Sequence, residues 1–238
     1  MPPPPSFRSV VGRLAKHYGP PQPPPPKGPF ELILWENVAY LADDERRGEA
    51  FALLKKKVGT SPAKILDASS ATLRTVTAHG ILPERFAGKL REVARIAVEE
   101  FGGDLDTVVA GPVAGARKAL QRFPGIGRPG AEKILLFLRR HPSLAVESNG
   151  LRVLTRLGII RAEKSYASGY AHAQKAAADE LGDDFGVLIT AHLLLRRHGQ
   201  VLCRRSAPAC GRCPLAPVCL YLADRSAPAS NEAKARPS

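Results

Sequence analysis

Four cysteines lie close together in the last third of the 238-residue chain, and no other cysteine occurs. Cys203, Cys210, Cys213 and Cys219 give the spacing C-x6-C-x2-C-x5-C. Zinc also binds four thiolates, but usually through two well separated CxxC pairs. Here a single CxxC is flanked by lone cysteines, a pattern that favours an iron–sulfur cubane whose four irons each take one sulfur. The prediction is a structural [4Fe-4S] cluster, with zinc or unliganded thiols as the alternatives.

The chain is strongly basic, with 35 Lys and Arg residues against 22 Asp and Glu residues and a formal net charge of +13. This balance favours a polyanionic partner, because neutralised phosphates release their counterions. A basic composition without such a partner is the alternative. Arg204, Arg205 and Arg212 lie in the cysteine loop, where they would contact phosphate.

A glycine-rich turn lies in the middle of the chain, where residues 120–127 read LQRFPGIG. Its glycines would expose backbone N–H groups to a phosphate, and Ile126 would pack between the flanking helices. Pro124, Gly125, Gly127 and Arg128 complete the predicted contact. Such a turn is often a plain connector. Combined with the basic charge and the cysteine loop, it indicates a helix-hairpin-helix that binds the DNA backbone without reading sequence.

The elements that must position these residues are helices, because no segment alternates like a strand and Val108-Val109 is too short to count. The absence of a glycine-rich loop after a strand disfavours a Rossmann or P-loop enzyme. The fold class predicted is therefore all-α. The expected helices are Ser6–His17, Phe30–Leu41, Asp44–Lys57, Ser61–Leu66, Ser70–Ala78, Pro83–Phe101, Val113–Arg122, Gly130–Arg140, Gly150–Leu157, Ala162–Leu181 and Phe185–His198.

The ends of the chain differ in composition from the rest. Proline-dense segments at 2–5 and 20–26 should be extended, and 223–238 should form a disordered tail. No apolar stretch is long enough to span a membrane, and the start lacks an apolar signal core. The expected location is a reducing bacterial cytoplasm, at the nucleoid, where disulfides are disfavoured.

Four segments, in this order, resemble the endonuclease III/MutY superfamily of DNA glycosylases (HhH-GPD): 29–32 (PFEL), 123–128 (FPGIGR), 145–147 (AVE) and 198–199 (HG), which runs into the cysteine loop. The resemblance covers about residues 28–222, and the cysteine spacing is its most specific feature. It implies a six-helix barrel at 29–141 that carries the hairpin, and a cluster domain at 142–222 joined by a helix from the proline-rich segment 1–28. Double-stranded DNA with a damaged or mismatched base would lie across the cleft between them, bound by a monomer.

The resemblance also indicates two catalytic carboxylates. Counted without gaps from Pro124, Glu147 matches the family's essential aspartate, which would stabilise an oxocarbenium-like sugar or activate water. Glu36 stands where MutY-like adenine glycosylases carry their general acid, and apolar neighbours would favour its protonated form. As alternatives, Glu147 is only a charge at a helix N-terminus, and Glu36 is a solvent-facing glutamate.

Strand cleavage is not expected. Bifunctional members carry a lysine that attacks C1′ two residues after the hairpin's last glycine, and Pro129 occupies that position here. Lys133 lies one helical turn later. It could substitute for that lysine, but it is predicted to be a surface or phosphate-contacting residue.

The family inserts side chains from two loops into the base stack, and the matching residues are Leu41 and Ile81. Packing in the core is the alternative for both. Leu82 and Asn149 stand where endonuclease III has a tyrosine and a histidine, which indicates a lesion other than an oxidised pyrimidine.

The function predicted is base-excision repair by a monofunctional DNA glycosylase. A DNA-lesion or DNA-structure binding protein that has lost catalysis is the alternative, favoured by the changes at Pro129 and Glu147. A cluster protein that serves redox signalling on DNA is a more remote option.

Overall fold

The computed structural model describes residues 3–226 of the chain, and every regular element in this range is a helix. The all-α prediction is thereby confirmed. None of these helices has the length and apolar character needed to cross a membrane. The α-helices are α1 (Phe7–Tyr18), α2 (Pro29–Asn37), α3 (Asp44–Lys57), α4 (Pro62–Asp67), α5 (Ser70–Thr77), α6 (Pro83–Glu99), α7 (Leu105–Ala110), α8 (Val113–Leu120), α9 (Arg128–Phe137), α10 (Ser148–Leu157), α11 (Tyr166–Leu181), α12 (Phe185–Val201) and α13 (Leu220–Ser226), with short 3-10 turns η1 (Cys210–Arg212) and η2 (Ala216–Val218).

These helices form two compact units. The hairpin unit contains residues 22–145 and 183–189, and so includes α2 to α9. The cysteine unit contains residues 3–21, 146–182 and 190–226, and so includes α1, α10, α11, α13 and most of α12. Glu36 and the glycine-rich turn therefore belong to the hairpin unit, whereas Glu147 and the four cysteines belong to the cysteine unit.

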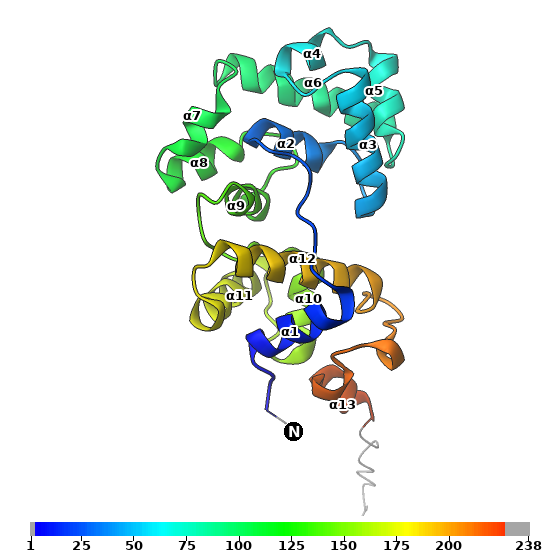
Figure 1. Ribbon diagram of the computed structural model, residues 1–238, viewed down its shortest axis with the longest axis vertical. Helices are drawn as coiled ribbons and strands as arrows, with labels where there is room; N and C mark the ends of the chain where they lie inside the picture. Colours follow the sequence, from blue (N-terminus) through cyan, green and yellow to red (C-terminus); the bar gives the residue numbers. More distant parts are fainter. Residues whose placement is uncertain (1–2, 227–238) are drawn as a thin grey trace, which may run out of the picture. The chain divides into compact units, whose positions relative to one another are not determined.

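Helix α2 lies at the centre of the hairpin unit. Leu32, Ile33, Leu34 and Trp35 are consecutive in sequence and all buried, the pattern of a helix surrounded on every side. It contacts α3, α6, α7 and α9 (Figure 1). It ends at Asn37, earlier than the sequence predicts, because the chain then turns into a loop in which Leu41 adopts a left-handed φ of 55°.

Helix α7 is the one helix of this unit that the sequence does not predict. Its start is capped by Asp104, whose carboxylate accepts the Thr107 N–H at 3.0 Å. Leu105 and Val109 are buried in the core. The cap and this burial outweigh the weak helix propensity of the β-branched pair Val108-Val109.

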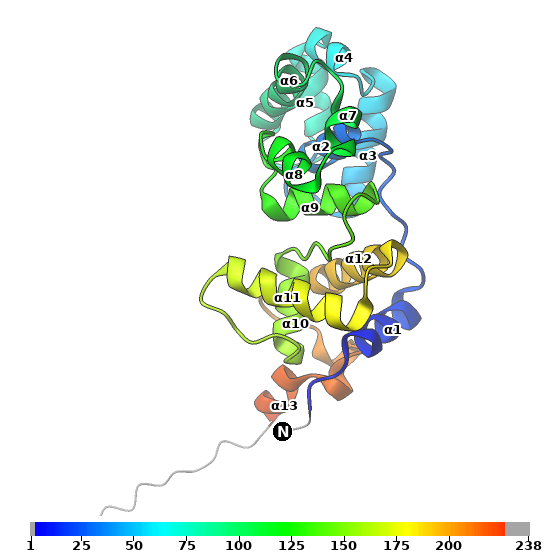
Figure 2. The same ribbon diagram turned by 90° about the vertical axis from the view of Figure 1, so that its left-hand side faces the viewer.

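The cysteine unit combines segments from the beginning and the end of the described residues. The apolar face of α1, formed by Phe7, Val10 and Leu14, is fully buried, and α1 packs against α11. The backbone N–H of Phe7 also donates to the Glu180 carboxylate at 2.7 Å. Helix α10 contacts both α11 and α13 (Figure 2).

Several boundaries in this unit differ from the sequence prediction, two of them by four residues. Helix α11 begins at Tyr166 rather than at Ala162, because the Ser165 side chain accepts the Ser168 N–H and caps the helix there. Residues 223–226, part of the segment expected to be a disordered tail, belong to α13. The rest of that segment, 227–238, lies outside the described residues.

Candidate functional site

The glycine-rich turn joins α8 to α9 and presents backbone atoms to solvent. Ile126 is buried, as predicted, and its N–H donates to the Phe123 carbonyl at 3.1 Å. Gly125, at a left-handed φ of 80°, and Gly127 are exposed. No side chain caps the start of α9, whose first residue is the exposed Arg128. The N–H groups of its first turn are thus open to an anion.

A buried carboxylate that the sequence analysis missed lies behind this turn. Glu132 on α9 is 1% exposed and forms ion pairs with Arg128 at 3.1 Å and with Arg117 of α8 at 3.3 Å. It therefore connects the two hairpin helices and orients Arg128. The available signal was the spacing of Arg128 and Glu132, four residues apart on one helix.

The two wedge candidates are at the surface of the hairpin unit. Leu41 is 72% exposed and Ile81 is 50% exposed, so neither is a core residue. The Ile81 N–H donates to the Tyr40 carbonyl at 3.1 Å, which ties the α2–α3 loop to the α5–α6 loop. Leu82 is also exposed and, like Leu41, has a left-handed φ, here 56°. The two loops therefore form one apolar tip, made of Leu41, Ile81 and Leu82.

Gly80 allows the two loops of the apolar tip to meet. A Cβ at this position would lie 2.8 Å from the Tyr40 carbonyl oxygen and closer still to the Tyr40 nitrogen. Because backbone atoms cannot move away cheaply, we expect Gly80→Ala to cost about 2–3 kcal/mol of unfolding free energy, the upper part of the range for overpacking. Binding to duplex DNA should weaken about tenfold as the tip is displaced, roughly 1.4 kcal/mol. Urea denaturation and fluorescence anisotropy measure the two effects.

Gly88 provides the matched control for Gly80. It lies inside α6, and a Cβ there would meet nothing within 4 Å. Gly88→Ala should therefore stabilise the fold by about 0.5–1 kcal/mol, the difference in helix propensity. Equal stabilities for the Gly80→Ala and Gly88→Ala proteins would contradict the close approach at Gly80.

Glu36 of α2 and Lys133 of α9 form an ion pair of 2.7 Å. Their side chains are only 18% and 13% exposed, respectively. Glu36 is thus not a solvent-facing glutamate, and Lys133 is mostly buried rather than exposed, whereas the phosphate contact predicted for it stays a prediction. The ion pair occupies the Lys133 amine, and the catalytic role predicted for Glu36 stays a prediction.

Glu147 precedes α10 and is held from two sides. Its Oε1 accepts from Asn149 Nδ2 at 2.8 Å, and its Oε2 lies 3.3 Å from Nε of the buried Arg196. Although Glu147 is at the N-cap position, its side chain makes no capping hydrogen bond. Burial, and then the charge of Glu147, raises the pKa of the neighbouring Tyr166 to about 12. The carboxylate is therefore oriented by side chains rather than by the helix end.

A hydrogen-bonded chain connects Glu147 to the cysteine loop. Beyond Glu147, Asn149 Oδ1 accepts from an Nη of Arg152 at 2.8 Å. The same guanidinium donates to the carbonyls of Gly199 at 2.7 Å and Cys203 at 2.9 Å. Both ends of the Asn149 amide are thus engaged inside the protein. The position of Glu147 and the conformation of the cysteine loop depend on the same arginine.

The four cysteines are half-buried and line one small apolar cavity together with Arg156, Leu202, Pro208 and Tyr221. Arg156 donates to the Cys203 sulfur at 3.3 Å, and His198 Nε2 lies 3.5 Å from the Cys213 sulfur. Burial raises the pKa of the Cys213 thiol. Within residues 3–226 no group of three or more His, Cys, Asp or Glu side chains is arranged to hold a metal ion. The chemistry of the donors nevertheless suits a cluster, because four cysteines line one cavity with N–H donors of Arg156 and His198 beside two of them.

The three arginines predicted to contact phosphate, Arg204, Arg205 and Arg212, are exposed on the cysteine loop. Arg204 donates to the Ala207 carbonyl at 3.2 Å. The backbone carbonyls of Arg204 and Arg205 accept from Arg156, which anchors this part of the loop to α10.

Comparisons with known proteins agree with this architecture, although no protein-family model matches the chain. The endonuclease III of Rickettsia prowazekii is 30% identical over 104 residues, 44% of this chain and 46% of that protein, so the match spans about half its length. The endonuclease III of Sulfolobus acidocaldarius is 26% identical over 198 residues, 82% of this chain and 83% of that protein. A solved non-covalent endonuclease III–DNA complex superposes with a TM-score of 0.72 at 20% identity, covering 92% of this chain and 96% of that one. This likeness shows the fold.

Proposed function

We propose that this chain, which belongs to the endonuclease III/MutY-like helix-hairpin-helix superfamily of DNA glycosylases, excises a damaged or mismatched base from double-stranded DNA. It extrudes the base and hydrolyses its N-glycosidic bond. The observation that carries the proposal is Glu147, a part-exposed carboxylate held by Asn149 and Arg196. We expect it to act as a monomer, at the bacterial nucleoid.

Glu147 supplies the charge that the reaction needs. When the base leaves, positive charge develops on the sugar near C1′, and an ionised carboxylate stabilises it or activates the attacking water. Asn149 donates to one carboxylate oxygen and the cation of Arg196 lies beside the other, which holds the carboxylate in one orientation. Part of the Glu147 side chain, 29%, is exposed and accessible to substrate.

The hairpin unit would hold the duplex. The open N–H groups at the start of α9, with Arg128 beside them, suit a backbone phosphate. The apolar tip of Leu41, Ile81 and Leu82 would fill the gap that the extruded base leaves.

Cys203, Cys210, Cys213 and Cys219 would hold a [4Fe-4S] cluster. When bound, it supplies four iron–thiolate bonds that brace the loop. Arg156 contacts Cys203 Sγ and the carbonyls of Arg204 and Arg205, and so fixes the loop beside α10. The exposed arginines of the loop would then meet phosphate.

Strand cleavage through a lysine is not part of the proposal. Pro129 has no amine, and the amine of Lys133 is paired with Glu36 at 2.7 Å. The product is an abasic site in an uncut strand.

A panel of labelled duplexes tests the activity. The duplexes carry uracil, thymine mismatches, alkylated purines, oxidised bases or adenine opposite damaged guanine. After incubation with the protein, each sample is analysed with and without alkali treatment. We expect at least one duplex to break only after alkali, and no covalent complex to be trapped by borohydride. A trapped complex that disappears in Lys133→Ala would overturn the monofunctional assignment.

The same panel also tests the second candidate function, a protein that binds lesions without catalysis. The ion pair between Arg196 and Glu147 favours this candidate, because it neutralises the carboxylate before substrate arrives. Tight binding to one lesion duplex without base release at any protein concentration would establish it.

A further inference from the structure

A hollow of about 460 Å³ lies on the cysteine unit beside Glu147. Three arginines line it, Arg152, Arg156 and Arg205, together with Ser148 and Tyr166. Its volume is within the range of small-molecule sites, which is roughly 300–1,000 Å³. No Asp or Glu is among the residues that line it. A concave surface lined by charges of one sign concentrates the opposite charge.

Two of the three guanidinium groups are fixed in place. Arg152 and Arg156 donate to backbone carbonyls around the cysteine loop. Within residues 3–226 the carboxylate of Glu147 is linked to Arg152 only through Asn149 and makes no direct ion pair with it. Their positive charges are therefore positioned but not neutralised by these bonds. Arg205 is exposed at the same hollow. The arrangement suits a phosphate group, which takes several N–H donors at once.

Tyr166 contributes an aromatic surface to this hollow. It is 44% exposed, although its ring is held by a hydrogen bond from its hydroxyl to the Val146 carbonyl at 2.9 Å and by stacking on Tyr170 at 6.0 Å between centroids. An exposed ring that is held in place suits base stacking, because little side-chain freedom is lost on binding.

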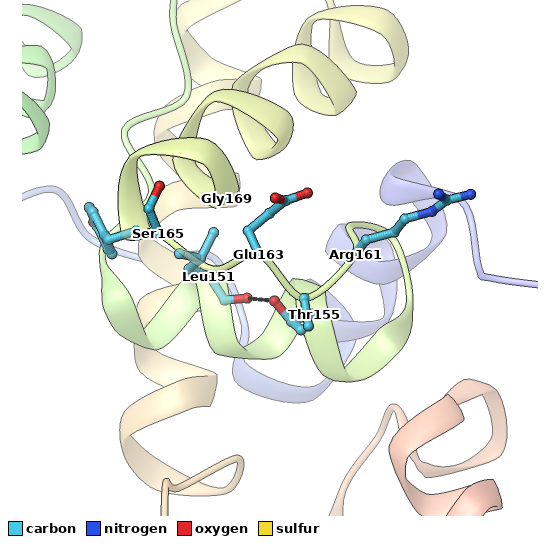
Figure 3. A pocket seen from close by; sticks show the side chains of 8 residues that line it. Leu151, Thr155, Arg161, Glu163, Ser165 and Gly169 are labelled. Atoms are coloured by element: carbon cyan, nitrogen blue, oxygen red, sulfur yellow. Dashed lines mark hydrogen bonds between the residues drawn. The ribbon is translucent and has the colours of Figure 1, made fainter.

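The hollow continues into a second, smaller one of about 180 Å³. Leu151, Thr155 and Tyr166 line both. Figure 3 shows the smaller hollow, where the Thr155 hydroxyl donates to the Leu151 carbonyl and Arg161 extends from the α10–α11 loop. Tyr166 thus lines both hollows, of which the larger carries three arginines, whereas the smaller carries Arg161 and the carboxylate of Glu163.

We infer that the larger hollow binds one unpaired nucleotide of a DNA strand, with its base stacked on Tyr166 and its phosphate held by Arg205, Arg152 and Arg156. A positive groove with an aromatic side chain is the combination by which proteins bind single strands without reading sequence. This gives the cysteine unit an affinity for unpaired DNA that is independent of the glycine turn. The inference takes DNA as the polymer from the proposed function, but it does not require base release.

The test uses a short 5′-fluorescein-labelled oligo(dT), with binding followed by anisotropy at several salt concentrations. Tyr166→Leu removes the ring and should weaken binding about tenfold, the lower part of the ~1–3 kcal/mol per stacked base. Tyr166→Phe keeps the ring and should restore most of the affinity. Arg205→Ala should lower both the affinity and the salt slope, the latter by about 0.7 for one phosphate contact.

Arg13→Ala is the matched control, because it removes an exposed arginine from α1 of the same unit. Its affinity should stay that of the unaltered protein, and circular dichroism checks that every variant is folded. Loss of affinity in Arg13→Ala equal to that in Arg205→Ala, or full affinity in Tyr166→Leu, would overturn the inference. Single-strand binding that depends on Tyr166 would support it even in a protein that releases no base from any duplex.

Discussion

Replacement of Glu147 by glutamine should reduce base release about 10³-fold, within the ~10²–10⁴ that a positioned acid–base group contributes. Glutamine keeps the size of the side chain and can still accept the Asn149 hydrogen bond, but it carries no charge to stabilise the sugar cation. The measurement is single-turnover base release at saturating protein, on whichever lesion duplex the unaltered protein processes. Affinity for that duplex should stay within about twofold, because no phosphate contact is removed.

Glu147→Asp is the informative companion to Glu147→Gln. It keeps the negative charge, with one methylene less, and introduces the aspartate that the sequence resemblance predicts at this position. We expect it to retain far more activity than the glutamine variant, with a loss of up to ~10²-fold if the shorter side chain misplaces the charge. If Glu147→Gln and the unaltered protein release base at equal rates, the carboxylate has no part in the chemistry.

Replacement of Arg152 by leucine should reduce base release about 10²-fold and weaken retention of the proposed [4Fe-4S] cluster. One guanidinium holds Asn149, Gly199 and Cys203, and each hydrogen bond from a charged group contributes about 1.5–3 kcal/mol. Without it, Asn149 no longer holds Glu147 in one position, and two carbonyls of the loop region lose their donor. Iron per chain after gel filtration and single-turnover base release measure the two consequences separately.

Arg156→Leu is the matched control for Arg152→Leu. Arg156 also anchors the cysteine loop, through Cys203 Sγ and the carbonyls of Arg204 and Arg205, but it makes no hydrogen bond to Asn149. We expect both variants to lose iron, whereas base release per iron-loaded molecule should fall much further in Arg152→Leu. Equal base release per loaded molecule would show that Arg152 serves the loop alone.

Local motifs were predictable from the sequence because short segments determine them. The buried Ile126, the start of α9 near Pro129 and the clustering of the four cysteines around one cavity all follow from residues adjacent in sequence. Helix α7 was missed because its formation depends on a cap and on burial, and burial is decided by the rest of the unit.

Contacts between distant segments were not predictable in the same way. Periodicity shows that α2 and α9 are helices, but not that Glu36 and Lys133 meet, since this depends on how the two helices pack. The partners of Glu147 illustrate the same limit. Asn149 is two residues away, whereas Arg196 comes from α12. A resemblance to a family singled out Glu147 as a candidate, and only the folded chain shows the side chains around it.

The left-handed backbone at Leu41 and Leu82 has a consequence for the evolution of this protein. Each costs about 1–2 kcal/mol relative to an ordinary conformation, and glycine or asparagine would relieve it. Selection for thermal stability alone would therefore replace both leucines. The resulting protein would be more stable but would lose two of the three side chains of the apolar tip. Leucine at both positions therefore keeps two exposed apolar side chains at the expense of stability.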